Sequence, residues 1–181
     1  AKISGKIEVI ENLLDKVDTL IVGGGMSYTF FKAMGLEIGV SLLEEDRIQV
    51  ARDIISHSSE RNVELLMPVD VVVADRFAID AQMQVVNRDS MPAEWEGVDI
   101  GPATRALYSK LVSQAGTVVW NGPLGVFEME PFAQGTLSVA QALVQATERG
   151  TISIIGGGDT AAAVTQMGLA DGMTHISTGG G

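Results

Sequence analysis

The chain has 181 residues, 46% of them hydrophobic, and this length suits one domain with a substantial core. Its formal net charge of −11 argues against a nucleic-acid or anionic-membrane surface, because the phosphates of such partners repel an acidic protein. The absence of cysteine excludes disulfides and catalysis by a thiol.

The sequence shows no targeting or membrane segment. No apolar run approaches the ~20 residues of a spanning helix, and no signal peptide is visible. We therefore expect a soluble, cytoplasmic protein. The chain starts at Ala1 without a methionine and ends inside the glycine run 179–181, which we interpret as a fragment of a longer protein.

Helix-like segments alternate with short apolar runs along the chain. Isoleucine and leucine recur at spacings of three and four over 1–14, which predicts an amphipathic helix. Further helices are predicted at 26–34, from about 44 to 61, from 101 onward, from 136 onward and after 158. Strands are predicted at 19–22, 63–67, 117–120, 151–155 and 174–177, with 71–74 and 84–86 paired as a hairpin and 90–97 as a loop.

Strands that alternate with helices indicate an α/β fold whose parallel sheet is covered on both faces. In such a sheet the ligand site lies outside the carboxyl ends of the strands. Four predicted strands end in glycine-bearing turns, at 23–25, 121–125, 156–158 and 179–181. One such turn is weak evidence, but four at one edge indicate an extended ligand that carries phosphate.

The segment 151–164 carries this pattern most clearly, with a β-branched run, three glycines, Asp159, Thr160 and a helix rich in small residues. Glycines let the backbone approach a ligand, and the N–H groups of the following helix favour anions. Asp159 is then either a helix cap or an oxygen ligand for magnesium. Taken alone, the segment fits an ordinary capped turn equally well.

Two well-known phosphate signatures are missing. A P-loop needs a Gly-Lys pair followed by a hydroxyl residue, but Gly5 and Lys6 precede Ile7. The dinucleotide fingerprint needs a third glycine where this chain has Tyr28, which counts against a nicotinamide-dependent dehydrogenase.

Six runs, in the same order, resemble the phosphoglycerate kinase family: AKISGKIEVIENLL, LIVGGGMSYTFFKA, LMPVDVVVAD, TVVWNGPLGVFE, IIGGGDT and HISTGGG. The resemblance covers the whole chain and is to the C-terminal, nucleotide-binding half of that family. It implies one Rossmann-like three-layer αβα domain over 1–181, truncated at both ends, without the N-terminal phosphoglycerate-binding domain. We expect five parallel strands of the family's six, plus a small hairpin. The missing strand would leave two strand edges unpaired.

The resemblance also implies roles for residues near the two ends of the chain. Lys2 would stabilise the phosphoryl group in flight, and Lys6 would contact the nucleotide phosphates. Gly180 and Gly181 would open a helix that faces the transferring phosphate. The alternative is that both lysines lie on a solvent-exposed helix face without a functional role, as most lysines do.

The resemblance places the nucleotide among the glycine turns. Gly24 and Gly25 would line one side of the adenine slot and Gly97 and Val98 another, and Glu128 would accept hydrogen bonds from the ribose. The remaining implied contacts are Asn121 near the phosphates, Pro123 and Val126 beside the base or ribose, and Gly157, Gly158, Asp159 and Thr160 around phosphate and magnesium, with Asp159 as the metal ligand. When each residue is taken alone, the alternative is that Asn121 only forms the turn at a strand end and that Glu128 is an ordinary surface residue.

The main functional hypothesis is the Mg-ADP/ATP-binding half of a monomeric glycolytic kinase, inactive by itself because its second substrate site is missing. That kinase moves a phosphoryl group between 1,3-bisphosphoglycerate and ADP, giving 3-phosphoglycerate and ATP. The alternative is a non-catalytic nucleotide-binding module.

Overall fold

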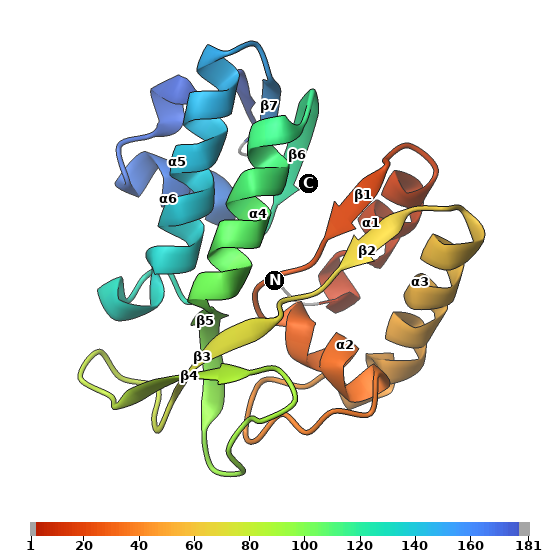
Figure 1. Cartoon of the computed structure of the whole chain (residues 1–181), viewed down its shortest axis with the longest axis vertical. Coiled ribbons are helices and arrows are strands. Elements are labelled where there is room, and N and C mark those ends of the chain that lie inside the picture. Colours follow the sequence, from red (N-terminus) through yellow and green to blue (C-terminus); the bar gives the residue numbers. More distant parts are fainter. Residues whose placement is uncertain (1–2, 178–181) are drawn as a thin grey trace.

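The computed structural model describes residues 3–177, in which helices pack against two small parallel sheets and a third, antiparallel sheet lies at one end (Figure 1). The strands are β1 (Thr19–Ile21), β2 (Glu64–Leu66), β3 (Asp70–Ala74), β4 (Met83–Asn87), β5 (Glu96–Ile100), β6 (Thr117–Asn121), β7 (Ile152–Gly156) and β8 (His175–Ile176). The α-helices are α1 (Ile7–Leu14), α2 (Met26–Ala33), α3 (Ile48–Glu60), α4 (Pro102–Gln114), α5 (Gln134–Glu148) and α6 (Gly158–Gln166). Short 3-10 turns are η1 (Ile3–Gly5), η2 (Glu45–Arg47), η3 (Glu130–Phe132) and η4 (Ala170–Gly172).

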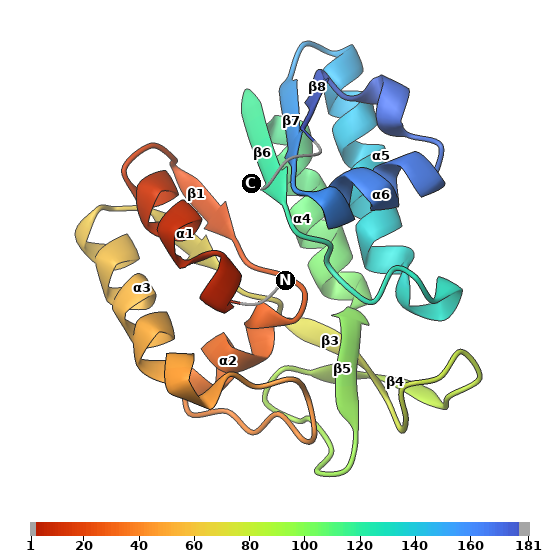
Figure 2. The same ribbon diagram turned by 180° about the vertical axis from the view of Figure 1, so that it is seen from behind.

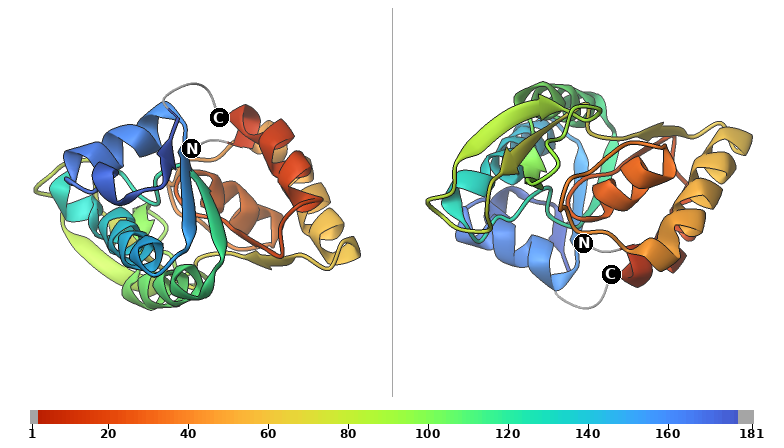
Figure 3. Two further views of the ribbon diagram at one scale, coloured as in Figure 1. Left: turned by 90° about the horizontal axis from the view of Figure 1, so that it is seen from above. Right: turned by 90° about the horizontal axis from the view of Figure 1, so that it is seen from below.

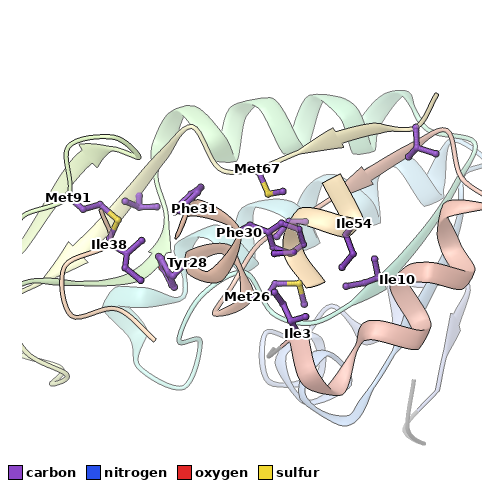
Figure 4. Close-up of a cluster of buried hydrophobic side chains, with 14 of the residues drawn as sticks. Ile3, Ile10, Met26, Tyr28, Phe30, Phe31, Ile38, Ile54, Met67 and Met91 are labelled. Atoms are coloured by element: carbon purple, nitrogen blue, oxygen red, sulfur yellow. The ribbon is translucent and has the colours of Figure 1, made fainter. Parts of the chain in front are cut away.

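The first half of the molecule packs α1, α2 and α3 against the parallel pair β1–β2. Phe30 and Phe31 of α2 are fully buried, and Ile54 of α3 lies in the same cluster (Figure 4). The helix predicted over 1–14 is shorter, because η1 comes first and α1 begins at Ile7. Gly5 explains the break, since glycine is a poor helix former.

The second half packs α4 and α5 against the parallel sheet β6–β7–β8, with α6 following β7 (Figure 2). Its own core contains the fully buried Tyr108, Leu143 and Ile155. Alanines at 140 and 163 are completely buried, and their small side chains suit close helix packing. The apolar runs therefore form one core for each half, and a third, smaller cluster contains Ala74, Val98 and Phe132.

A three-stranded antiparallel sheet, β4–β3–β5, lies at one end of the two halves. The predicted hairpin is confirmed, because β3 pairs with β4 over Asp70–Ala74 and Met83–Asn87. The prediction of a loop over 90–97 is wrong at its end, where Glu96 and Gly97 belong to β5. The apolar run between Gly97 and Gly101 is short and flanked by glycines, so the local sequence pattern does not predict this strand.

The parallel strands agree with the predicted α/β, Rossmann-like arrangement, but they do not form one continuous sheet. Five parallel strands are present among residues 3–177, in the separate sheets β1–β2 and β6–β7–β8. Within this range β1 pairs only with β2, and β6 pairs only with β7. The expectation of two unpaired strand edges is therefore confirmed, and the two half-sheets lie side by side when seen end-on (Figure 3).

The start of α4 is held by a carboxylate from another strand. Asp70 accepts hydrogen bonds from Ala103 N (3.0 Å) and Thr104 N (2.9 Å), and the Thr104 hydroxyl donates to it at 2.6 Å. Gly101 makes room for this contact, because a Cβ there would lie 2.3 Å from the Asp70 carboxyl carbon. Asp70 thus satisfies the first free N–H groups of α4 and fixes α4 to β3.

Replacement of Asp70 by alanine leaves those buried N–H groups without acceptors. We expect Asp70→Ala to lower the free energy of unfolding by about 2 kcal/mol, measured by urea denaturation. The matched control, Asp171→Ala, changes an exposed aspartate and should stay close to the unmodified chain. Equal stability of the two variants would contradict the capping role of Asp70.

Candidate functional site

A pocket of about 470 Å³ collects residues from several glycine turns. Eight residues that the sequence implicated line it: Gly24, Gly25, Gly97, Val98, Pro123, Val126, Glu128 and Asp159. Six further lining residues were not predicted: Tyr28, Leu42, Phe77, Glu96, Gly125 and Phe127. The pocket therefore has backbone and apolar walls with three carboxylates, a composition that suits a small polar ligand.

The glycine of β5 is required by a close approach across the pocket. A Cβ on Gly97 would lie 2.3 Å from the ring of Tyr28, which is itself buried. Burial, with Asp99 and Glu96 nearby, raises the pKa of the Tyr28 hydroxyl, so the ring stays neutral. In the turn before α2, Gly24 has a φ of 70°, a left-handed conformation that glycine adopts at little cost.

A buried carboxylate supports the wall formed by Val98 and Val126. Asp99 is 2% exposed and accepts hydrogen bonds from Ile100 N (2.8 Å) and from Gly135 N (2.9 Å) at the start of α5. Val126 N donates to Val98 O at 2.9 Å, which joins the loop after β6 to β5. Burial raises the pKa of Asp99 to about 7, against the opposite effect of its two N–H donors.

A second group of predicted residues lies at the carboxyl end of β6, outside the lining of this pocket. Lys6 Nζ donates to Asn121 Oδ1 at 2.5 Å, so the half-buried lysine is held at the end of the strand. Gly157, with a φ of 86°, passes Asn121 so closely that a Cβ would lie 2.9 Å from Asn121 Oδ1. That Cβ would also lie 3.9 Å from Lys6 Nζ, so these three residues form one cluster.

The start of α6 presents one exposed carboxylate and one buried hydroxyl. Gly158 opens the helix and Asp159 follows in its first turn. Thr160 is buried, and its hydroxyl accepts a hydrogen bond from Gly122 N at 2.7 Å. Thr160 therefore ties the turn after β6 to α6.

Asp159 suits a magnesium ion that is shared with phosphate. Within residues 3–177 no protein group donates a hydrogen bond to its exposed carboxylate, and no group of three or more metal-binding side chains occurs there. Magnesium is usually held by one or two carboxylates together with substrate phosphates. The single carboxylate thus fits magnesium bound with a nucleotide and does not fit a stand-alone metal site.

Three predicted residues, Lys2, Gly180 and Gly181, lie outside the described residues. The pocket residues that sequence reasoning missed come from other elements. Phe77 follows β3 and is 57% exposed, so an apolar side chain at a strand end was the only available signal. Leu42 and Glu96 gave no local signal, because only the tertiary fold brings them to the pocket.

Comparison with known proteins decides the family. The family model described as phosphoglycerate kinase matches residues 1–181. The chain belongs to the phosphoglycerate kinase family. A phosphoglycerate kinase of Chlorobium phaeobacteroides (strain BS1) is 55% identical over 181 residues, which are 100% of this chain and 46% of that protein. The chain thus spans less than half the length of this relative.

Solved structures of the family share the fold described above. The chain matches phosphoglycerate kinase from Coxiella burnetii with a TM-score of 0.95 and 50% identity, over 99% of this chain and 46% of that one. It matches the phosphoglycerate kinase from Pyrococcus horikoshii OT3 with a TM-score of 0.81 and 28% identity, over 99% and 45% of the two chains. Among the described residues, no helix is both long and apolar enough to cross a membrane.

The raised pKa of Asp99 predicts a pH-dependent stability. The pKa of the Asp99 carboxyl rises from 3.8 to about 7 on folding. Its contribution to stability is therefore complete below pH 3.8 and is lost as the pH rises through 7. Relative to Asp99→Asn, the unmodified chain should therefore lose stability between these two pH values, by up to about 1.4 kcal/mol per pH unit. Urea denaturation at several pH values measures this difference. Parallel curves for the two proteins would contradict the assignment.

Proposed function

We propose that this chain is the nucleotide-binding half of a phosphoglycerate kinase. The whole enzyme would transfer a phosphoryl group, reversibly, from the carboxyl group of 1,3-bisphosphoglycerate to ADP, giving 3-phosphoglycerate and ATP. The observation that carries the proposal is the 470 Å³ pocket, because it brings eight predicted nucleotide contacts together in a chain of this family.

The pocket is suited to the base and ribose. Gly24 and Gly25 on one wall and Gly97 and Val98 on another offer backbone and apolar surface to a flat base. Pro123 is buried nearby, and the exposed Glu128 can accept hydrogen bonds from ribose hydroxyls. The unpredicted Phe77 adds an aromatic side chain that can pack on the base.

The phosphates would extend from this pocket toward the cluster at the end of β6. Lys6 supplies a cation there, and the N–H groups at the start of α6 favour anionic oxygens. Asp159 would hold magnesium against those oxygens, and the ion would neutralise part of their charge. Such transfer depends mainly on positioning and charge stabilisation, so a lysine, a helix start and one carboxylate are suitable parts. Lys2 completes the proposal as the residue that stabilises the phosphoryl group in flight.

We propose that the acceptor side of the reaction belongs to the remainder of a longer protein. The chain spans 46% of its Chlorobium relative, and transfer requires closure around both substrates. The isolated chain should therefore bind nucleotide without turning it over. We place the whole protein in the cytoplasm as a monomer in glycolysis. A non-catalytic nucleotide-binding module would use the same pocket, and turnover by the full-length protein separates the two functions.

Calorimetric titration with Mg-ADP tests the phosphate end of the site. We expect Asp159→Ala to weaken Mg-ADP binding about tenfold or more, because the metal loses its only carboxylate from the described chain. Asp171→Ala serves as the matched control and should bind like the unmodified chain. Binding that is unchanged in Asp159→Ala would contradict the magnesium assignment. An unmodified chain that unfolds cooperatively but binds no nucleotide would contradict the pocket as it stands.

Substitution of Gly97 tests the base end of the site. An alanine there places a Cβ 2.3 Å from the Tyr28 ring, so the Tyr28 side chain or the backbone of β5 must shift, and both line the pocket. We expect Gly97→Ala to weaken ADP binding at least tenfold in the same titration, with or without magnesium. Gly116→Ala is the control, because a Cβ at Gly116 meets nothing within 4 Å. Equal affinity of both variants would place the base elsewhere.

A further inference from the structure

The carboxylate of Glu44 joins two segments that lie far apart in the sequence. It accepts a hydrogen bond from Ile3 N at 2.7 Å and a longer one from Ser4 N at 3.4 Å. The shorter distance is typical of a hydrogen bond to a charged group, which is stronger than a bond between neutral groups. Within residues 3–177, no other side chain bonds to the backbone of η1. Glu44 does not line the nucleotide pocket, so the proposed function gives it no role.

The backbone of Glu44 is fixed on both sides, which gives its carboxylate a defined direction. Glu44 N donates to the hydroxyl of Thr29 at 3.2 Å, and Thr29 is buried in α2. Arg47 N donates to Glu44 O at 2.9 Å and closes η2. The helix α2 begins directly after Gly25, which lines the nucleotide pocket. Glu44 therefore ties η1 to the helix that follows one wall of this pocket.

The turn η1 depends on such outside contacts. It spans three residues, and its last hydrogen bond runs from Lys6 N to Ile3 O at 2.8 Å. A turn of this length is not stable alone, and Gly5 within it adds backbone freedom. The fully buried side chain of Ile3 anchors the turn to the core of the first half (Figure 4). The carboxylate of Glu44 anchors its backbone.

The residue placed by this turn is Lys6. Its ammonium group reaches the second half of the molecule, where it donates to Asn121 Oδ1 at 2.5 Å. A lysine carries its charge on a flexible stem of four carbons, so the position of the ammonium group depends on contacts at both ends of the side chain. Asn121 holds one end, and η1 holds the other through the backbone of Lys6.

We propose that Glu44 is a positioning residue for the phosphate end of the site. It holds η1 where Lys6 reaches Asn121 and meets the phosphates of the nucleotide. The role toward nucleotide rests on the proposed function, whereas the effect of Glu44 on Lys6 can be measured without nucleotide. Charge alone predicts that loss of Glu44 strengthens the binding of an anionic nucleotide, because a negative charge is removed. Positioning predicts the opposite sign.

The NMR signal of the Asn121 side-chain amide tests the contact without nucleotide. Lys6→Met defines this signal for an Asn121 that has lost its ammonium partner. We expect Glu44→Ala to move the signal at least about half of the way to that position, and Glu44→Gln, which keeps an acceptor oxygen, to leave it nearly unchanged. Glu45→Ala is the matched control, because Glu45 is an exposed neighbour with the same charge. Equal signals in Glu44→Ala and Glu45→Ala would overturn the proposal.

Calorimetric titration with Mg-ADP tests the consequence for binding. We expect Glu44→Ala to weaken binding about tenfold, and Glu44→Gln to stay within about threefold of the unmodified chain. Glu45→Ala should bind equally or slightly more tightly. Binding by Glu44→Ala that matches Glu45→Ala would overturn the proposal.

The same titration in a chain that already carries Lys6→Met separates positioning from a general loss of structure. Because Glu44 acts through Lys6, Glu44→Ala should weaken binding by less than about twofold in this background. An equal loss in both backgrounds would overturn the proposal. If the unmodified chain binds no Mg-ADP, the proposed function fails, and the Asn121 signal still decides whether Glu44 positions Lys6.

Discussion

The spacing between β1 and β6 is the constraint on which the rest of the structure depends. Each strand is hydrogen-bonded on one side only within the described chain. Leu20 of β1 packs on the core of the first half, whereas Ile21 packs on the core of the second half, to which Trp120 of β6 belongs. Few hydrogen bonds join the two halves near the carboxyl ends of β1 and β6. The Tyr108 hydroxyl donates to Val22 O at 2.7 Å, and Lys6 donates to Asn121. These two hydrogen bonds fix the position of one parallel sheet relative to the other, where β1 and β6 are not paired with each other.

The candidate site inherits this constraint because its walls come from both halves. Gly24 and Gly25 follow β1, whereas Pro123, Val126 and Glu128 follow β6. The antiparallel sheet joins the walls, since β5 contributes Gly97 and Val98 and its Asp99 bonds to the start of α5. Any change in the distance between the sheets therefore changes the nucleotide pocket.

The sequence predicted the features whose signals are local. Glycine turns after β-branched runs located the ends of β1, β6 and β7. The family resemblance of 151–160 and of the other glycine turns then predicted that these strand ends bind a nucleotide. The sequence did not predict the features that depend on tertiary contacts. One is β5, a short strand flanked by glycines. The others are Leu42, Phe77 and Glu96, which reach the pocket only after folding. Asp99 also gave no signal, because its altered pKa arises from burial.

Amide hydrogen exchange along β1 and β6 tests the open-edge arrangement most directly. The amides of Leu20, Val22, Val118 and Trp120 should exchange slowly, because they donate to β2 or β7. Those of Thr19, Ile21, Thr117 and Val119 should exchange much faster, since they face away from β2 and β7 and donate to no strand of the described chain. Residue-resolved exchange by NMR should show this alternation along both strands. Uniformly slow exchange along both strands would contradict the account.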